Sequence, residues 1–222
     1  MSARELRERL RRRARHANLN PAADLLEGLE RYYVLLARWN AKMNLTAFKL
    51  PPGGDDEAID RLLLEPLVAA RQLPSHTTSM LDTGSGGGSP AIPLKLATPT
   101  MRLRMVEVKT RKAVFLREAV RELALNDADV ETARFEELLA RPEMHESADV
   151  VTIRAVRVEP KVLMTLQAFL KPRGLLLLFR GPSGGQFAET VTPPLVWKAT
   201  FPLLESLRSR LVVLEKVRVG PQ

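Results

Sequence analysis

Residues 81–93 read LDTGSGGGSPAIP, in which a short apolar strand runs directly into a glycine-rich turn. Gly84, Gly86 and Gly88 remove side chains where the backbone must turn tightly and where a ligand can approach the main chain. A glycine-rich turn alone is also compatible with a flexible loop that binds nothing. Its meaning therefore depends on the elements that surround it.

From about residue 79 the chain alternates short β-rich runs with helical patterns. Strands are expected at 80–83, 102–106, 129–132, 149–153 and 175–179, with a last strand at 209–217. Helices are expected at 110–123, 135–140 and 161–170, the last of them opened by Pro160. Such alternation is typical of βαβ units, which build a mainly parallel sheet with helices on both faces. The predicted fold class is α/β, with the glycine turn after the first strand.

The first part of the chain has a helical pattern of its own. Apolar residues recur at three- and four-residue spacing from Leu25 to Met43, which predicts an amphipathic helix. A loop at 50–56 separates this helix from a second apolar segment at 59–73, where Pro66 is expected to kink or restart the helix. We therefore divide the chain into an N-terminal helical extension, 1–75, and a ligand-binding α/β domain, 76–222.

The composition excludes several classes of chemistry. The 222 residues include no Cys and three His, so disulfides, thiolate nucleophiles and Cys-based zinc sites are ruled out, and no metal site is expected. Neither a signal peptide nor a membrane span is apparent, which predicts a cytoplasmic protein. A net charge of +8 favours an anionic partner such as nucleic acid, although a solvated Arg-rich face would account for it equally well.

Two acidic residues sharpen the interpretation of the glycine turn. Asp82 stands immediately before the glycines, and Glu107 ends the next predicted strand. In a doubly wound sheet these strands are neighbours, so Glu107 can accept hydrogen bonds from both ribose hydroxyls of a nucleotide-like cofactor. A nicotinamide cofactor shares this feature, but its pyrophosphate needs a free helix N-terminus. Because Asp82 suits an α-amino group and prolines follow the turn, the residues favour S-adenosylmethionine.

Two further segments lie at the same predicted edge of the sheet. Residues 132–137, TARFEE, follow the third strand, where a backbone donor and a carboxylate can meet an adenine edge; a surface ion pair is the simpler interpretation of Arg134 and Glu136. Arg154 ends the fourth strand, where open α/β sheets bind ligands. We expect Arg154 to contact cofactor or substrate, although it is also compatible with a plain surface residue.

Motifs along nearly the whole chain resemble those of one protein family. In chain order they are RWNAKMNLT at 38–46, the glycine turn with its trailing prolines, KTRKAVFL at 109–116, RFE at 134–136, IRA at 153–155 and LVVLEK at 211–216. This set is similar to the bacterial ribosomal RNA small-subunit methyltransferase G family, also called glucose-inhibited division protein B. The Trp-Asn-x-x-x-Asn-Leu-Thr signature is the most specific of these matches. Core packing of Trp39 and helix capping by Asn44 are the simpler alternatives.

The resemblance implies a class I (Rossmann-like) methyltransferase with a mainly parallel seven-stranded sheet and an N-terminal helical extension. It implies methyl transfer from S-adenosylmethionine to N7 of a guanine in 16S rRNA, with small-subunit rRNA or the ribosomal subunit as partner. We separately expect a monomer. Together with the residues above, the resemblance carries cofactor contacts onto a set spread over the sheet edge: Asp82, Gly84, Gly86, Gly88, Ser89, Glu107, Val108, Phe135, Glu136 and Arg154. It places Arg154 in a catalytic role and Asn44, Thr46 and Arg180 on the substrate side.

The chain also departs from the family pattern. Where the family has His-x-Leu-Asp-Ser, residues 62–66 read LLLEP, and where it has Gly-Pro-Gly-x-Pro-Gly, residues 86–91 read GGGSPA. The ribose acid is Glu107 rather than Asp, and Arg180 replaces a Lys. These changes leave cofactor binding in place and put the exact target guanine in doubt. They also keep open a non-catalytic or differently targeted RNA-binding paralogue as an alternative.

The sparse inventory of reactive side chains fits transfer to guanine N7. That nitrogen carries an in-plane lone pair and no proton, so no general base is needed and positioning supplies most of the rate, up to about 7–11 kcal/mol. The absence of Cys argues against transfer to pyrimidine C5. An early cluster is expected to hold rRNA phosphates, unless it is only a solvated or frayed helix. Its members are Arg4, Arg7, Arg9, Arg11, Arg12, Arg13 and Arg15.

Overall fold

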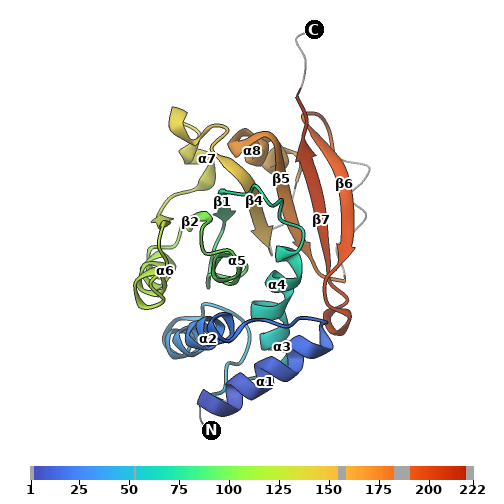
Figure 1. Cartoon of the computed structure of the whole chain (residues 1–222). Helices are drawn as coiled ribbons and strands as arrows, with labels where there is room; N and C mark the ends of the chain where they lie inside the picture. Colours follow the sequence, from blue (N-terminus) through green and yellow to red (C-terminus); the bar gives the residue numbers. More distant parts are fainter. Residues whose placement is uncertain (1–2, 53, 155–158, 183–190, 219–222) are drawn as a thin grey trace.

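A seven-stranded sheet forms the centre of the molecule in the described part of the chain (Figure 1). The computed structural model describes residues 3–52, 54–154, 159–182 and 191–218. The strands are β1 Ser79–Thr83, β2 Arg102–Val106, β3 Ala128–Glu131, β4 Ala148–Arg154, β5 Leu170–Arg180, β6 Leu195–Pro202 and β7 Arg210–Lys216. Their order in the sheet is β3-β2-β1-β4-β5-β7-β6. The predicted α/β class with a mainly parallel sheet is confirmed.

Strand direction brings the expected site residues to one edge of the sheet. The pairs β1–β2, β1–β4, β2–β3 and β4–β5 are parallel, while β7 runs antiparallel to both β5 and β6. In this register Asp82 lies between Met105 of β2 and Thr152 of β4. The carboxyl ends of the parallel strands therefore meet beside the glycine turn, where open α/β sheets bind ligands.

The helices cover both faces of the sheet. They are α1 Ala3–His16, α2 Ala23–Met43, α3 Asp56–Ile59, a π-helix Asp60–Leu64, α4 Glu65–Ala70, α5 Ala91–Ala97, α6 Thr110–Glu122, α7 Phe135–Leu138 and α8 Pro160–Phe169. Along β5, Leu175 and Leu177 belong to one hydrophobic cluster with residues of α2, α5 and α6, whereas Leu176 and Leu178 belong to a second cluster with residues of α8. Alternate side chains of a strand point to opposite faces, so a strand buried on both sides is apolar throughout.

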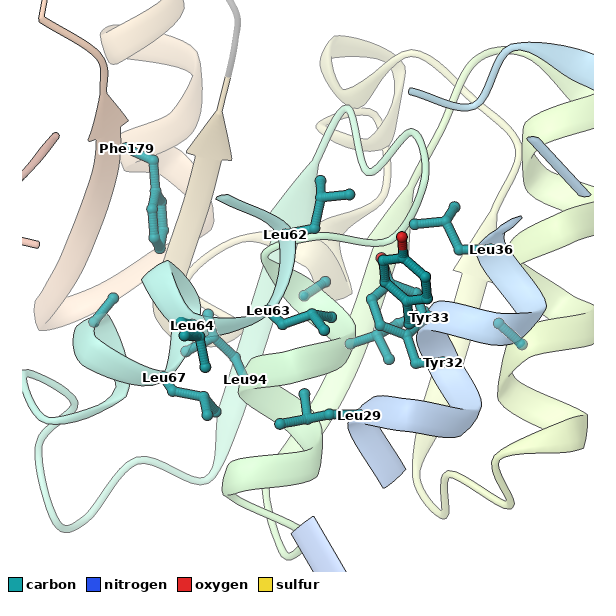
Figure 2. Packing of buried hydrophobic residues seen from close by; sticks show 14 of the residues in the cluster. Leu29, Tyr32, Tyr33, Leu36, Leu62, Leu63, Leu64, Leu67, Leu94 and Phe179 are labelled. Atoms are coloured by element: carbon teal, nitrogen blue, oxygen red, sulfur yellow. The ribbon is translucent and has the colours of Figure 1, made fainter. Parts of the chain in front are cut away.

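The N-terminal helices share a single hydrophobic cluster with the sheet. Leu6 of α1 and Leu29 of α2 belong to the same cluster as Met80 of β1 and Leu177 of β5. Figure 2 shows the side chains of α2 packed beside the 62–67 segment and Leu94 of α5. The expected extension, residues 1–75, therefore packs directly onto the expected α/β domain, residues 76–222.

Two elements were not located from the sequence. β6 was not predicted; it is an edge strand in which Leu195 alone is buried, although its sequence is rich in apolar residues. α5 was not predicted; Pro90 and Pro93 occupy its N-cap and first turn, where proline is tolerated. As predicted, the 59–73 segment restarts near Pro66, which lies in the first turn of α4 after the π-helix.

Candidate active site

A cavity of about 530 Å³ opens at the carboxyl edge of the central strands. Its walls come from the end of α2 and the loop after it, the π-helix, the glycine turn and the ends of β4 and β5. The lining residues are Leu36, Leu45, Thr46, Ala47, Phe48, Arg61, Leu62, Gly84, Ser85, Gly86, Gly87, Ser89, Lys112, Arg154, Phe179 and Gly181. This volume is within the range of small-molecule and cofactor sites.

The glycine turn is held by hydrogen bonds to the neighbouring strand. Gly84, Gly86 and Gly88 have φ of 73°, 54° and 89°, a region that L side chains rarely adopt. The amides of Gly84 and Ser85 both donate to the carbonyl of Val106, at 2.9 and 3.1 Å. At Gly86 an added Cβ would have only the Gly84 carbonyl (3.7 Å) and the Lys112 Nζ (4.0 Å) nearby, so the backbone is open to an approaching ligand.

Glu107 supports the turn from β2. Its Oε2 accepts from the amide of Gly86 at 2.9 Å, and its Oε1 accepts from the amide of Lys109 at 2.8 Å. A carboxylate offers about four lone-pair sites, so both oxygens retain capacity for ribose hydroxyls. The residue is 6% exposed, and its position fits the role expected from the sequence.

Asp82 is a buried carboxylate with one unsatisfied oxygen in the described structure. Its Oδ1 accepts from the hydroxyl of Thr152 at 2.5 Å, whereas Oδ2 is buried and has no hydrogen-bond partner in the described structure. Burial raises the pKa of Asp82 to about 6, despite the hydrogen bond from Thr152, which lowers it. An unpaired buried carboxylate oxygen needs a donor, and the α-amino group of an amino-acid-like ligand supplies one.

Arg154 is buried, and its guanidinium binds protein groups. Nη1 donates to the carbonyl of Arg61 at 2.8 Å and to Glu65 Oε2 at 3.2 Å, and Nη2 donates to the carbonyl of Ser89 at 2.8 Å. Phe179 lies beneath it, with the ring centroid 5.9 Å from the guanidinium carbon. Burial lowers the pKa of Arg154, and Glu65 opposes this shift. The residue lies at the strand end as expected, but its side chain joins three protein segments.

Two neighbouring tyrosines of α2 are fully buried. The hydroxyl of Tyr32 donates to the carbonyl of Gly87 at 2.6 Å, whereas that of Tyr33 donates to the carbonyl of Pro51 at 3.2 Å. Burial raises the pKa of Tyr32 well above its ordinary value and that of Tyr33 to about 12. Both side chains therefore stay protonated and act as hydrogen-bond donors.

The Trp-Asn-x-x-x-Asn-Leu-Thr segment builds one wall of the cavity. Asn40 accepts from the amide of Thr46 at 2.9 Å and donates to the carbonyl of Phe48 at 3.2 Å, which closes the loop after α2. Trp39 packs edge-on against Phe115 of α6, with ring centroids 5.8 Å apart. Asn44 is the C-cap of α2 with φ of 21°. The signature therefore shapes the loop that faces the glycine turn.

Comparisons of the amino-acid sequence with known proteins identify one family. The family model described as rRNA small subunit methyltransferase G matches residues 25–191, more than half of the chain. The chain belongs to this family. Ribosomal RNA small subunit methyltransferase G of Roseiflexus sp. (strain RS-1) is 34% identical over 199 residues, covering 87% of this chain and 77% of that protein. The protein of the same name from Stenotrophomonas maltophilia (strain K279a) is 36% identical over 188 residues, covering 80% and 83%.

Solved structures support the class I methyltransferase fold. A SAM-dependent methyltransferase from Aquifex aeolicus superposes with a TM-score of 0.55 at 14% identity, covering 74% of this chain and 94% of that chain. At this identity the likeness concerns the fold alone. Family membership and fold together exclude the nicotinamide oxidoreductase that the glycine turn left open, and the resemblance to the methyltransferase G family is confirmed.

The structure brings part of the predicted site together in the cavity. Five of the expected residues line it: Thr46, Gly84, Gly86, Ser89 and Arg154. Asp82 and Gly88 belong to the same strand and turn without lining the cavity, and Glu107 holds the turn. The remaining expected residues are not in its lining: Asn44, Val108, Phe135, Glu136 and Arg180. Ala155, the last residue of the Ile-Arg-Ala match, lies outside the described residues.

Val108, Phe135 and Glu136 stand at the ends of β2 and β3. Val108 is 53% exposed, Phe135 is half-buried and Glu136 is exposed, so an adenine group on this edge would meet an open surface. Arg180 ends β5 opposite Arg210, and burial together with Arg210 lowers its pKa. These four assignments remain predictions.

Several cavity residues were missed from the sequence. Lys112 and Arg61 add positive charge to the walls, and Tyr32 and Glu65 hold the turn and Arg154 from behind. Lys112 is part of the KTRKAVFL motif, so its place in the motif was the available signal. Glu65 stands at the position of the acid in the family's His-x-Leu-Asp-Ser, which was the available signal. Tyr32 carries no such signal, because an aromatic residue in a helix pattern is usually core.

The early arginines have two different environments. Arg7 pairs with Glu30, Arg9 with Asp56 and Arg13 with Asp60, and these pairs attach α1 to α2 and to the segment 56–60. Arg4, Arg12 and Arg15 are exposed. The alternative of a frayed helix does not hold, because Leu6, Leu10 and Ala14 on the inner side of α1 are fully buried. Phosphate contact by the exposed arginines stays a prediction beside the alternative of a solvated face. Within the described residues, no helix has the length and apolar content needed to cross a membrane.

Proposed function

We propose that this protein transfers a methyl group from S-adenosylmethionine to N7 of a guanine in small-subunit rRNA. The observation that carries the proposal is the glycine turn, which lies between Asp82 of β1 and Glu107 just after the neighbouring strand β2. The chain that carries this turn belongs to the rRNA small subunit methyltransferase G family. Family membership does not favour the alternative, a non-catalytic RNA-binding paralogue.

The residues present fit S-adenosylmethionine. The unpaired Oδ2 of Asp82 suits the α-amino group, and Glu107 suits the ribose hydroxyls. Gly86 leaves open backbone where a Cβ would otherwise stand. Phe135 and Glu136 are proposed to meet the adenine and Val108 the ribose. When bound, the cofactor supplies an electrophilic methyl group on a sulfonium sulfur.

The cavity lining fits a nucleophile that has no proton to lose. Among its described residues there is no carboxylate, imidazole or thiol, and the titratable side chains are Arg61, Lys112 and Arg154. A general base is therefore not part of this wall, which suits the N7 lone pair of guanine. The protein contributes alignment and exclusion of water, and three cations suit a polyanionic substrate.

RNA is proposed to reach the cavity along the basic N-terminal side. Thr46 lines the cavity, and Asn44 and Arg180 stand on flanking segments as proposed substrate contacts. Of the early arginines, the exposed Arg4, Arg12 and Arg15 are the proposed phosphate contacts.

We further propose that the enzyme acts as a cytoplasmic monomer. The described large apolar side chains that remain exposed are dispersed over α2, α6, α8, β6 and the loop after β2, whereas stable dimers bury a contiguous apolar patch. Sedimentation of the purified chain at micromolar concentration tests this statement, and a dimer peak would contradict it.

The test of the function is transfer of a labelled methyl group to small-subunit rRNA, followed by mapping of 7-methylguanine in cells with and without the gene. Loss of one 7-methylguanine on gene deletion supports the proposal. Cofactor binding without transfer to free rRNA or to the small subunit would favour the non-catalytic paralogue. A Gly84→Val control should abolish cofactor binding, because Gly84 has φ of 73° in the turn.

A further inference from the structure

Two carbonyls at the end of the glycine turn accept hydrogen bonds from side chains of α2 and β4. Tyr32 of α2 donates its hydroxyl proton to the Gly87 carbonyl at 2.6 Å, and Arg154 donates to the Ser89 carbonyl at 2.8 Å. Both donors are at least 85% removed from solvent, since Tyr32 is fully buried and the Arg154 side chain is 13% exposed. Water therefore competes poorly for either carbonyl.

Arg154 is itself fixed by the segment around the π-helix. Glu65 is 0% exposed and accepts from Arg154 at 3.2 Å and from Arg61 at 2.8 Å. The carbonyl of Arg61 accepts a second bond from the guanidinium at 2.8 Å. A buried guanidinium with a paired carboxylate and two carbonyls keeps a single orientation.

The hydroxyl of Ser89 makes the same connection in the opposite direction. It donates to the carbonyl of Leu62 in the π-helix at 2.6 Å. The turn is thus bound to α2 at Gly87 and to the 61–65 segment at Ser89, through side chains on both sides of the contact. The Ser89 side chain was expected to contact the cofactor, but its hydroxyl proton is donated in this bond to Leu62.

A turn with glycines at 84, 86, 87 and 88 has little conformational preference of its own. Binding of a ligand to a flexible turn carries the entropic cost of ordering that turn. Binding to a turn that is already held in the binding shape does not carry this cost. The bonds from Tyr32 and Arg154 reach the turn after Gly86, on the side away from the amide that Glu107 holds. They fix its second half, which strand pairing does not reach.

We propose that Tyr32 and Arg154 are positioning residues that hold the glycine turn in its cofactor-binding shape, with Glu65 keeping Arg154 in place. This inference rests on the proposed function and replaces the catalytic role that the sequence suggested for Arg154. It makes the N-terminal helices part of the cofactor site, although they supply only a few residues to its wall. Cofactor affinity then depends on how these helices pack.

The test compares two substitutions on adjacent residues of α2. Tyr32→Phe and Tyr33→Phe each remove one buried hydroxyl bonded to a backbone carbonyl, and only Tyr32 reaches the turn. We expect Tyr32→Phe to raise the Kd of S-adenosylmethionine about five- to tenfold, the effect of one neutral hydrogen bond. We expect Tyr33→Phe to leave that Kd within twofold of wild type, although both variants lose some thermal stability.

A second pair of variants tests the Arg154 branch. Glu65→Gln retains the shape of the side chain and removes its charge, and Arg154→Lys retains a charge and cannot span both carbonyls. Both should raise the cofactor Kd and the cofactor KM more than they change kcat. A purely structural role would lower the active fraction and leave both constants in place.

The outcomes separate the two proposals. If wild type binds S-adenosylmethionine and Tyr32→Phe and Arg154→Lys both bind within twofold, the inference is wrong and the proposed function stands. If Tyr33→Phe weakens binding as much as Tyr32→Phe, the effect is general loosening of α2 and the inference is also wrong. If wild type binds no S-adenosylmethionine by calorimetry, the proposed function itself fails.

Discussion

Thr152 donates its hydroxyl proton to Asp82 across two central parallel strands, with the oxygens 2.5 Å apart and both side chains at most 1% exposed. This bond satisfies one carboxylate oxygen and leaves the other without a partner in the described structure. The sheet therefore contains a buried carboxylate with one oxygen hydrogen-bonded and the other unsatisfied. Two predictions follow from the raised pKa of this acid.

The first concerns stability of the ligand-free protein. Because the pKa of Asp82 is raised from 3.8 to about 6, the folded state favours the proton. Stability from this group is fully present below pH 3.8 and is lost as pH rises towards 6, by about 3 kcal/mol at 1.36 kcal/mol per pKa unit. Asp82→Asn removes this loss. The variant should gain about 2 kcal/mol more over wild type at pH 8 than at pH 4.5, measured by urea unfolding; an equal difference at both pH values would contradict it.

The second concerns cofactor binding. If ionised Asp82 accepts from the α-amino group, the affinity for S-adenosylmethionine should rise about tenfold between pH 5 and pH 7 and then level off, following ionisation near pH 6. Asp82→Asn should bind weakly with a flat profile. The control ligand is 5′-methylthioadenosine, which lacks the amino acid and should show no pH dependence in this range. A parallel rise for both ligands would place the titrating group elsewhere.

The third prediction separates fold from binding within the glycine turn. An added Cβ at Gly88 would lie 2.5 Å from Ile92 Cδ1 and 3.3 Å from Leu116 Cδ2, whereas at Gly86 the nearest atom is 3.7 Å away. Both glycines have positive φ, so Gly88→Ala and Gly86→Ala share a backbone cost of about 1–2 kcal/mol. We expect Gly88→Ala to lose a further 1–3 kcal/mol, roughly the cost of overpacking. Gly86→Ala should instead lose cofactor affinity. Equal unfolding free energies for the two would contradict the packing described here.

The fourth prediction concerns RNA affinity. Deletion of α1 is unsuitable because Leu6, Leu10 and Ala14 are in the core. Arg12→Ala and Arg15→Ala change exposed side chains, and each lost phosphate contact should reduce the slope of log affinity against log salt by roughly 0.7–0.9. Arg7→Ala is the matched control, since it breaks the pair with Glu30 and should lower stability without changing the slope. An unchanged slope in both exposed variants would show that they contact no phosphate.

The elements that the sequence located well are those with a strong local pattern. β1, which is buried at every position, begins one residue earlier than expected. β2 matches its expected bounds although Arg102 is exposed, because its apolar residues still form a short run bounded by turn residues. The helix from Leu25 to Met43 is present as α2 because its apolar period is long and regular. β6 was missed because edge strands carry few buried residues.

Only the site residues whose positions are set by the backbone could be predicted from the sequence. Asp82, the glycines and Glu107 occupy fixed places after parallel strands, so strand order alone brings them together. The role of Arg154 depends on Glu65 and Ser89, which are distant in the chain and meet it only through packing of the π-helix. Pairing of side chains across such distances leaves no periodic trace in a single sequence.

One hydrophobic cluster contains both Leu6 of α1 and Val213 of β7. During synthesis, α1 and α2 emerge from the ribosome well before β5 and β7. They can pack against each other and against α5, but the cluster that they share with β5 and β7 is completed only at the end of the chain. Contacts of such long sequence separation form late and slowly. We expect nascent chains arrested before residue 170 to be protease-sensitive and to bind chaperones, and protection to arise only once β7 has joined β5. This member of the rRNA small subunit methyltransferase G family would then depend on chaperones until its last strand has joined the sheet.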